Sequence, residues 1–159
     1  MDRKIVLITG ATSGIGEACA KKFAKGGYNV ILTGRKVDRL KALAEELQAQ
    51  GAQTRVLVFD VRDRVAALKA VDSLEEEWRK IDVLINNAGL ALGLDKEYLG
   101  NPDDWSVMID TNIKGLLTMT RLIVPDMVRR NHGHVINIGS VAGDAAYAGG
   151  MCTVRPNLQ

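Results

Sequence analysis

Glycines and small polar residues fill positions 9–16, which have the sequence Thr-Gly-Ala-Thr-Ser-Gly-Ile-Gly. This segment follows the apolar run 5–8 and precedes an amphipathic segment, so it lies between a predicted buried strand and the start of a helix. Backbone N–H groups and the positive end of a helix dipole at such a turn can bind a diphosphate. Glycine-rich turns also connect strands and helices that bind nothing, and spacing alone leaves both interpretations open.

A basic pair, Arg35-Lys36, follows the second apolar run, residues 30–32. Sites for NAD usually carry an acidic residue here, which binds the ribose 2′-hydroxyl. An arginine suits a 2′-phosphate instead, because its guanidinium makes charge-assisted, fork-shaped hydrogen bonds. The alternative is that Arg35 only caps or solvates the next helix.

Polar or glycine-rich residues also follow the remaining predicted strands. Asp60-Val61 comes after residues 56–59, and its carboxylate could accept a hydrogen bond from an adenine amino group. Asn86-Asn87-Ala88-Gly89 comes after residues 83–85, and Gly139-Ser140 comes after residues 135–138. Because ligands of open parallel sheets bind outside the carboxyl ends of the strands, we expect these segments to form one site.

The elements that position these residues alternate between apolar strands and helical patterns. Five short apolar runs, at 5–8, 30–32, 56–59, 83–85 and 135–138, are typical of strands covered on both faces. Apolar residues at helical spacing occupy 15–23, 37–47 and 65–78. A longer helix is predicted from the cap Asn101 and from Pro102 at its first position to about Arg130. This alternation predicts an α/β fold with a parallel sheet.

Length and composition exclude several classes of function. The 159 residues are enough for one domain, and the net charge of +2 is not concentrated in a long run, which disfavours nucleic acid and anionic membranes as partners. No apolar stretch approaches the roughly 20 residues that span a bilayer, and the N-terminus does not resemble a signal peptide. Cys19 and Cys152 lack metal-ligand spacing. We expect a soluble, cytoplasmic protein that binds no metal.

Together these motifs resemble those of the short-chain dehydrogenase/reductase family. Residues 9–16 match its TGxxxGxG, and residues 86–89 match its NNAG. The segment 110–112 resembles the family's helical asparagine motif, and residues 135–140 resemble the strand that ends in its catalytic serine. The resemblance covers residues 4 to about 150. Residues 86–93 and 104–134 look most like the branch of NADP-dependent 3-hydroxy acid dehydrogenases, which includes serine and allo-threonine dehydrogenases.

The resemblance implies a Rossmann-type doubly wound parallel sheet, of which residues 1–150 supply the N-terminal five-strand portion in the order 3-2-1-4-5. Hydride would pass between NADP(H) and the hydroxyl or carbonyl carbon of a small 3-hydroxy acid or β-hydroxy amino acid. Ser140 would hydrogen-bond the substrate oxygen, and Asn112 would hold a water in the proton relay. Full-length members form homodimers or homotetramers. The implied cofactor-binding residues are Gly10, Thr12, Ser13, Gly14, Ile15, Gly16, Arg35, Asp60, Val61, Asn87, Ala88 and Gly89.

The resemblance fails at the catalytic pair. The family places a tyrosine thirteen residues after the serine and a lysine four residues later, but here those positions are Thr153 and Asn157. Restoring one base before the Met151 codon permits the frame Asn-Val-Tyr-Gly-Ala-Thr-Lys. We therefore predict a single-base deletion near the codons of Gly149 and Gly150 and an aberrant tail, 151–159.

We expect the chain as written to be inactive on its own. The alternative function is a non-catalytic dinucleotide-binding fragment, or a pseudoenzyme without the tyrosine and lysine. An unrelated Rossmann binding module is disfavoured, because Ser140 and Asn112 would have no reason to lie where they do.

Overall fold

The computed structural model describes residues 3–93 and 97–140 and contains a parallel sheet with the strand order β3-β2-β1-β4-β5. The strands are β1 (Ile5–Ile8), β2 (Asn29–Gly34), β3 (Thr54–Val58), β4 (Val83–Asn86) and β5 (His134–Asn137). All four neighbouring pairs are parallel. This arrangement confirms the predicted doubly wound fold and its order, and it moves the predicted third strand toward the N-terminus, so that Phe59 follows the strand.

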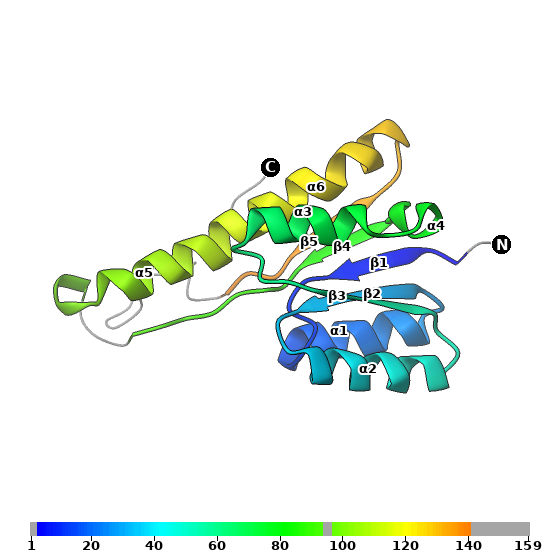
Figure 1. Cartoon of the computed structure of the whole chain (residues 1–159), viewed down its shortest axis with the longest axis horizontal. Coiled ribbons are helices and arrows are strands. Elements are labelled where there is room, and N and C mark those ends of the chain that lie inside the picture. Colours follow the sequence, from blue (N-terminus) through cyan, green and yellow to red (C-terminus); the bar gives the residue numbers. More distant parts are fainter. Residues whose placement is uncertain (1–2, 94–96, 141–159) are drawn as a thin grey trace.

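Helices cover both faces of the sheet, with α1 and α2 on one face and α3 and α6 on the other (Figure 1). The helices are α1 (Gly14–Lys25), α2 (Val37–Ala49), α3 (Arg64–Asp72), α4 (Glu76–Arg79), α5 (Pro102–Ile109) and α6 (Leu116–Arg129), with a short 3₁₀ turn at Glu97–Leu99. No helix in the described part of the chain is long and apolar enough to span a membrane.

Alternate residues of each strand enter two separate apolar cores, because successive side chains point to opposite faces of a sheet. Val6 and Ile8 pack with the α1 and α2 side, whereas Leu7 packs with Trp78 and the α6 methionines. All three strand residues are fully buried. The continuous apolar character of β1 therefore reflects burial on both faces, whereas the edge strands β3 and β5 are partly exposed and include polar residues.

The helix predicted over 65–78 is wrong as a single element, because α3 ends at Asp72 and α4 starts at Glu76. At the break, Arg79 donates to the Leu74 carbonyl at 2.8 Å and to the Asp72 carbonyl at 2.6 Å. These side-chain donors satisfy carbonyls that a continuing helix would have paired, so the chain can turn there.

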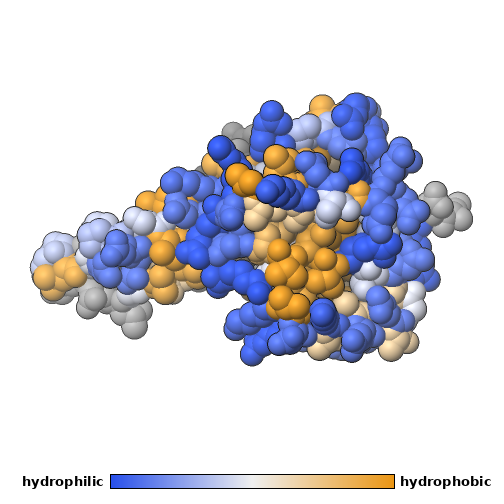
Figure 2. All heavy atoms as spheres, viewed as in Figure 1, coloured by the Kyte–Doolittle hydropathy of each residue, from blue (hydrophilic) through white to orange (hydrophobic). Residues whose placement is uncertain are grey.

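The predicted apolar stripe is wrong at its first two members, Val65 and Leu68, although Val71 on α3 does pack against the core. Val65 is 58% exposed and Leu68 is 44% exposed, whereas the small Ala67 is fully buried. Figure 2 shows apolar side chains on the surface where β3 forms the sheet edge below α3. Small residues on the buried face let α3 approach the core closely, which residue spacing does not reveal.

The long helix begins as predicted, with the Asn101 side chain accepting from the Asp103 N–H at 3.0 Å and Pro102 in the first turn. It departs from the prediction at Asp110–Gly115, which forms a π-helical turn between α5 and α6. Gly115 lets this turn lie close to Val61, because a Cβ there would lie 2.7 Å from a methyl carbon of Val61. Such π-turns often occur at functional sites, and this one contains Asn112.

Candidate functional site

A cleft of about 680 Å³ opens at the carboxyl edge of the sheet. Segments that follow all five strands contribute to it, as expected when parallel strands end at one edge. Of the residues predicted from the sequence, the cleft is lined by Gly10, Thr12, Ser13, Ile15, Arg35, Asp60, Val61, Asn87, Ala88, Gly89, Asn112 and Ser140. Lys36, Phe59, Leu90 and Thr111 also line it and were not predicted.

Two predicted glycines, Gly14 and Gly16, do not line the cleft and differ in their surroundings. Gly14 has a φ of +56°, and a Cβ there would meet nothing within 4 Å. A Cβ on Gly16 would instead overlap the Gly10 carbonyl oxygen and the Asn87 side-chain nitrogen. Gly16 therefore supports the turn from behind, where α1 packs against it.

Thr9 and Asn87 join the glycine turn to the segment after β4. The Thr9 hydroxyl oxygen accepts from the backbone N–H groups of Asn87 and Ala88, both at 2.9 Å. In return, the Asn87 amide donates to the carbonyls of Thr9 and Gly10 at 3.0 and 3.1 Å. Thr9 was placed in the glycine-rich motif, but its bonding role was not predicted, although a buried threonine at the end of an apolar strand requires a hydrogen-bond partner.

The N-terminus of α1 faces the cleft. Ser13, the residue before the helix, and Ile15 in its first turn both line the cleft. The Ser13 side chain makes no capping hydrogen bond, so it does not occupy the helix N–H groups that are left without partners inside the helix. Those groups and the helix dipole make this end of α1 suitable for an anion.

Three charged side chains meet at the ends of β2 and β3. The Arg62 guanidinium bonds both carboxylate oxygens of Asp60 at 2.7–3.1 Å, and the Arg62 backbone N–H adds a bond at 3.0 Å. Arg35 lies farther away, with its guanidinium 3.5 Å from Asp60. The bonds from Arg62, reinforced by the charge of Arg35, hold the pKa of the Asp60 carboxyl below its usual range against the opposing effect of burial. Arg35 and Asp60 were predicted from the sequence, whereas Arg62 was not.

The lowered pKa of Asp60 makes a small part of the stability dependent on pH. A carboxyl with a depressed folded-state pKa stabilises the fold above its unfolded pKa of about 3.9 and loses that contribution as the pH falls. The native chain should therefore have a higher free energy of unfolding than Asp60→Asn at neutral pH, and this difference should shrink in acid. The decrease should be less than about 1 kcal/mol, because the Asp60–Arg62 pair is partly exposed. Urea titrations at several pH values would measure it. A difference that stays constant with pH would contradict this expectation. Glu45→Gln, at an exposed position in the middle of α2, is a control for the charge change.

The π-turn directs Asn112 at the segment after β4. Its side chain accepts from the Leu90 N–H at 2.9 Å and donates to the Leu90 carbonyl at 2.8 Å. Asn112 thus holds the backbone that continues from Asn87–Gly89 in the wall of the cleft. Ser140 follows β5 and lies at the same cleft, where it is exposed.

The floor of the cleft between β4 and β5 is polar. Asn86 is buried and donates to the Thr120 hydroxyl at 3.1 Å and to the Asn137 side-chain oxygen at 3.0 Å. These bonds join the ends of β4 and β5 to α6. Positions 153 and 157, where the tyrosine and lysine were expected, lie outside the described residues.

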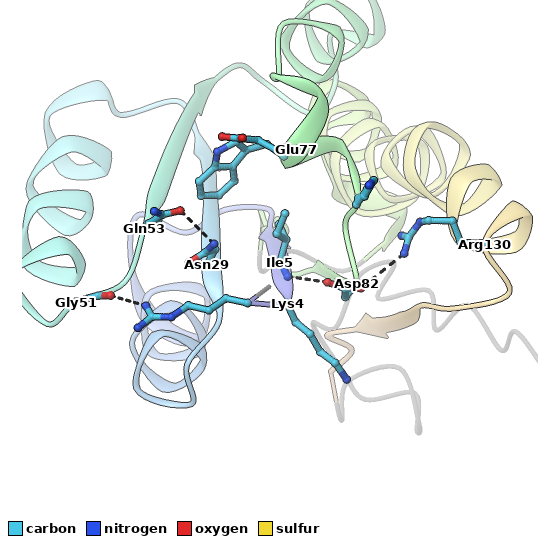
Figure 3. Close-up of a pocket in the computed structure, with 11 residues that line it drawn as sticks. Lys4, Ile5, Asn29, Gly51, Gln53, Glu77, Asp82 and Arg130 are labelled. Atoms are coloured by element: carbon cyan, nitrogen blue, oxygen red, sulfur yellow. Dashed lines mark hydrogen bonds and ion pairs between the residues drawn. The ribbon is translucent and has the colours of Figure 1, made fainter. Parts of the chain in front are cut away.

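A second hollow, of about 810 Å³, lies at the opposite edge of the sheet (Figure 3). Its polar groups are largely paired with one another. Arg3 donates to the Gly51 carbonyl, and Asp82 accepts from the Ile5 N–H at 2.8 Å with Arg130 beside it. This second hollow lies at the amino ends of the strands and lacks the glycine turn. The carboxyl-edge cleft is therefore the better candidate site.

Comparisons with known proteins identify the family to which this fold and these motifs are similar. A family model described as short chain dehydrogenase matches residues 4–152. The chain is 53% identical over 146 residues to the NADP-dependent 3-hydroxy acid dehydrogenase YdfG of Salmonella typhi. The aligned region covers 92% of this chain and 58% of that relative. It is 47% identical over 146 residues to sulfoacetaldehyde reductase 2 of Chromohalobacter salexigens, covering 91% of this chain and 58% of that relative.

Solved structures give the same result. The crystal structure of serine dehydrogenase from Escherichia coli superposes with a TM-score of 0.87 at 51% identity, over 92% of this chain and 66% of that one. The closed form of serine dehydrogenase complexed with NADP+ has the same TM-score and identity, over 92% of this chain and 58% of that one. The chain thus spans 58% of the length of these curated relatives.

Proposed function

The chain belongs to the short chain dehydrogenase family, and we propose that it is part of an oxidoreductase whose carboxyl-edge cleft binds NADP(H). The whole enzyme transfers a hydride between NADP(H) and the hydroxyl or carbonyl carbon of a small 3-hydroxy acid or β-hydroxy amino acid. The observation that carries this proposal is that the glycine turn, Arg35 and Asn87–Gly89 line one cleft. The names of the relatives, a 3-hydroxy acid dehydrogenase and a serine dehydrogenase, support the substrate class.

Three features of the cleft fit a dinucleotide phosphate. A Cβ on Gly10 would lie 2.9 Å from the Ala88 Cα, so only glycine lets the turn and the β4 segment approach each other. Beyond this contact, the N-terminus of α1 offers N–H groups to the diphosphate, and Arg35 stands at the end of β2 for the 2′-phosphate.

When bound, NADP(H) supplies or accepts the hydride. The residues of the chain position the reactants around it. Ser140 hydrogen-bonds the substrate oxygen, and Asp60 accepts from the adenine amino group while Val61 packs beside it. The side chain of Asn112 fixes the backbone at Leu90. Asn112 also holds the water of the proton relay.

Replacing Arg35 tests the preference for a 2′-phosphate. Because the guanidinium would make charge-assisted bonds to this group, Arg35→Ala should weaken NADPH binding roughly ten- to hundredfold and leave NADH binding almost unchanged. Quenching of protein fluorescence by each nucleotide would measure both affinities. Arg39→Ala, an exposed arginine on α2, is the matched control. Equal weakening for both nucleotides would contradict the assignment.

A non-catalytic dinucleotide-binding fragment is the second candidate, because Thr153 and Asn157 stand where the family has tyrosine and lysine. We infer a single-base deletion before the Met151 codon, and sequencing that region should reveal the missing base. The frame-restored protein should then oxidise serine or 3-hydroxypropionate with NADP+, whereas the chain as written should bind NADPH without turnover. An intact frame with no tyrosine and lysine codons in any frame would favour the fragment.

A further inference from the structure

The carboxylate of Asp60 lies close to Arg35, the residue proposed to bind the 2′-phosphate of NADP(H), so two negative charges would be neighbours at this site. It lines the cleft together with Arg35, and its carboxylate is 3.5 Å from the Arg35 guanidinium. Two consequences would follow if Asp60 had no other partner. The carboxylate would repel the phosphate, and it would also compete with the phosphate for Arg35.

Arg62 is placed to prevent both effects. Its guanidinium contacts both oxygens of Asp60, with the shortest bond at 2.7 Å, and its backbone N–H fixes the same carboxylate. Arg62 is not among the residues that line the cleft. Arg62 therefore affects a bound ligand through Asp60 and not by direct contact. The side chain of Arg35 is 60% exposed and stays available to bind the 2′-phosphate.

We propose that Arg62 is a positioning residue that sets the preference for a 2′-phosphorylated nucleotide by neutralising Asp60 and thereby releasing Arg35. This inference rests on the proposed NADP(H) site and adds a determinant behind it. The bidentate bond also holds the Asp60 carboxylate in one orientation, in which it remains an acceptor for the adenine amino group.

The test compares two small probes, adenosine 2′,5′-bisphosphate and adenosine 5′-monophosphate, which differ only in the 2′-phosphate. Both probes carry the adenosine half of NADP(H) without the nicotinamide, so the measurement does not depend on turnover. Calorimetric titration of the native chain should show tighter binding of the bisphosphate. In Arg62→Met, the ratio of the two affinities should fall roughly five- to tenfold at low salt, and the decrease should diminish at high salt.

A second substitution separates neutralisation from direct contact or loss of structure. Asp60→Asn keeps an acceptor oxygen and removes the charge, so the double variant Arg62→Met with Asp60→Asn should recover the native ratio to within about twofold. Arg64→Met removes an exposed arginine two positions away and should leave the ratio unchanged. Arg62→Lys keeps the positive charge but loses the fork-shaped pair of guanidinium donors. Its affinity ratio should lie between those of the native chain and Arg62→Met.

The outcomes distinguish this inference from the proposed function. A native chain that does not prefer the bisphosphate would overturn both. A native preference that survives Arg62→Met, or that the double variant fails to recover, would overturn only the role of Arg62. Equal loss of affinity for both probes in Arg62→Met would also overturn it, because it would indicate a purely structural role.

Discussion

Replacing Gly16 with alanine is expected to remove dinucleotide binding and to lower the free energy of unfolding by about 3 kcal/mol. The new methyl group would overlap the Gly10 carbonyl oxygen and the Asn87 side-chain nitrogen. The first of these is backbone, and the second is held by its bonds to Thr9 and Gly10. Relief would have to come from moving α1 away from β1, which would displace the helix N-terminus that faces the cleft.

Gly14→Ala is the matched control in the same turn. Its Cβ would meet no atom within 4 Å, so its cost comes from the positive φ alone, about 1–2 kcal/mol. Urea denaturation would give the two stabilities, and titration with NADPH would give the two affinities. If both alanine variants behaved alike, close packing behind the turn would not be the reason for Gly16.

Local patterns in the sequence predicted the features that depend on neighbouring residues. The central strands are buried on both faces, and the edge strands β3 and β5 still contain short apolar runs, so all five strands could be predicted. The Asn101 cap could be predicted because a helix cap needs only residues within one turn. Parallel strands that end at one edge also bring their following residues together. This explains why Arg35, Asp60 and Asn87 were found before their contacts were known.

The features that were missed depend on particular side-chain contacts, both local and between distant segments, that the spacing of apolar residues does not specify. The break between α3 and α4 is stabilised by bonds from Arg79, and the π-turn lies against Val61, with glycine at position 115 where a Cβ would clash. A stripe of apolar residues cannot reveal either. Arg62 is close to Asp60 in sequence, but an exposed arginine after a strand has many possible partners, and only the geometry identifies this one.

Asn112→Asp is expected to lower the free energy of unfolding by about 3 kcal/mol at neutral pH, with a distinctive dependence on pH. The substitution keeps the oxygen that accepts from the Leu90 N–H. It also replaces the amide that donates to the Leu90 carbonyl with a carboxylate oxygen 2.8 Å from that carbonyl. Two acceptors then face each other in a partly buried position, and the segment after β4 loses its support.

The sign of the pH effect is opposite to that for Asp60. Repulsion from the Leu90 carbonyl favours the protonated carboxyl, so the new aspartate has a folded-state pKa raised above its unfolded value of about 3.9. Its protonated form can donate to Leu90 as the amide did, and the penalty is therefore small in acid. The penalty grows as the pH rises through the folded-state pKa.

Asn112→Ala separates this charge effect from the simple loss of hydrogen bonds. Alanine leaves the Leu90 N–H and carbonyl without their side-chain partner at every pH, at a cost of about 2 kcal/mol. Urea titrations of both variants and the native chain from neutral to acidic pH would give the two differences in stability. A penalty for Asn112→Asp that is as independent of pH as that for Asn112→Ala would mean that the carboxylate avoids the Leu90 carbonyl. The paired bonds of Asn112 would then not be what fixes this wall of the cleft.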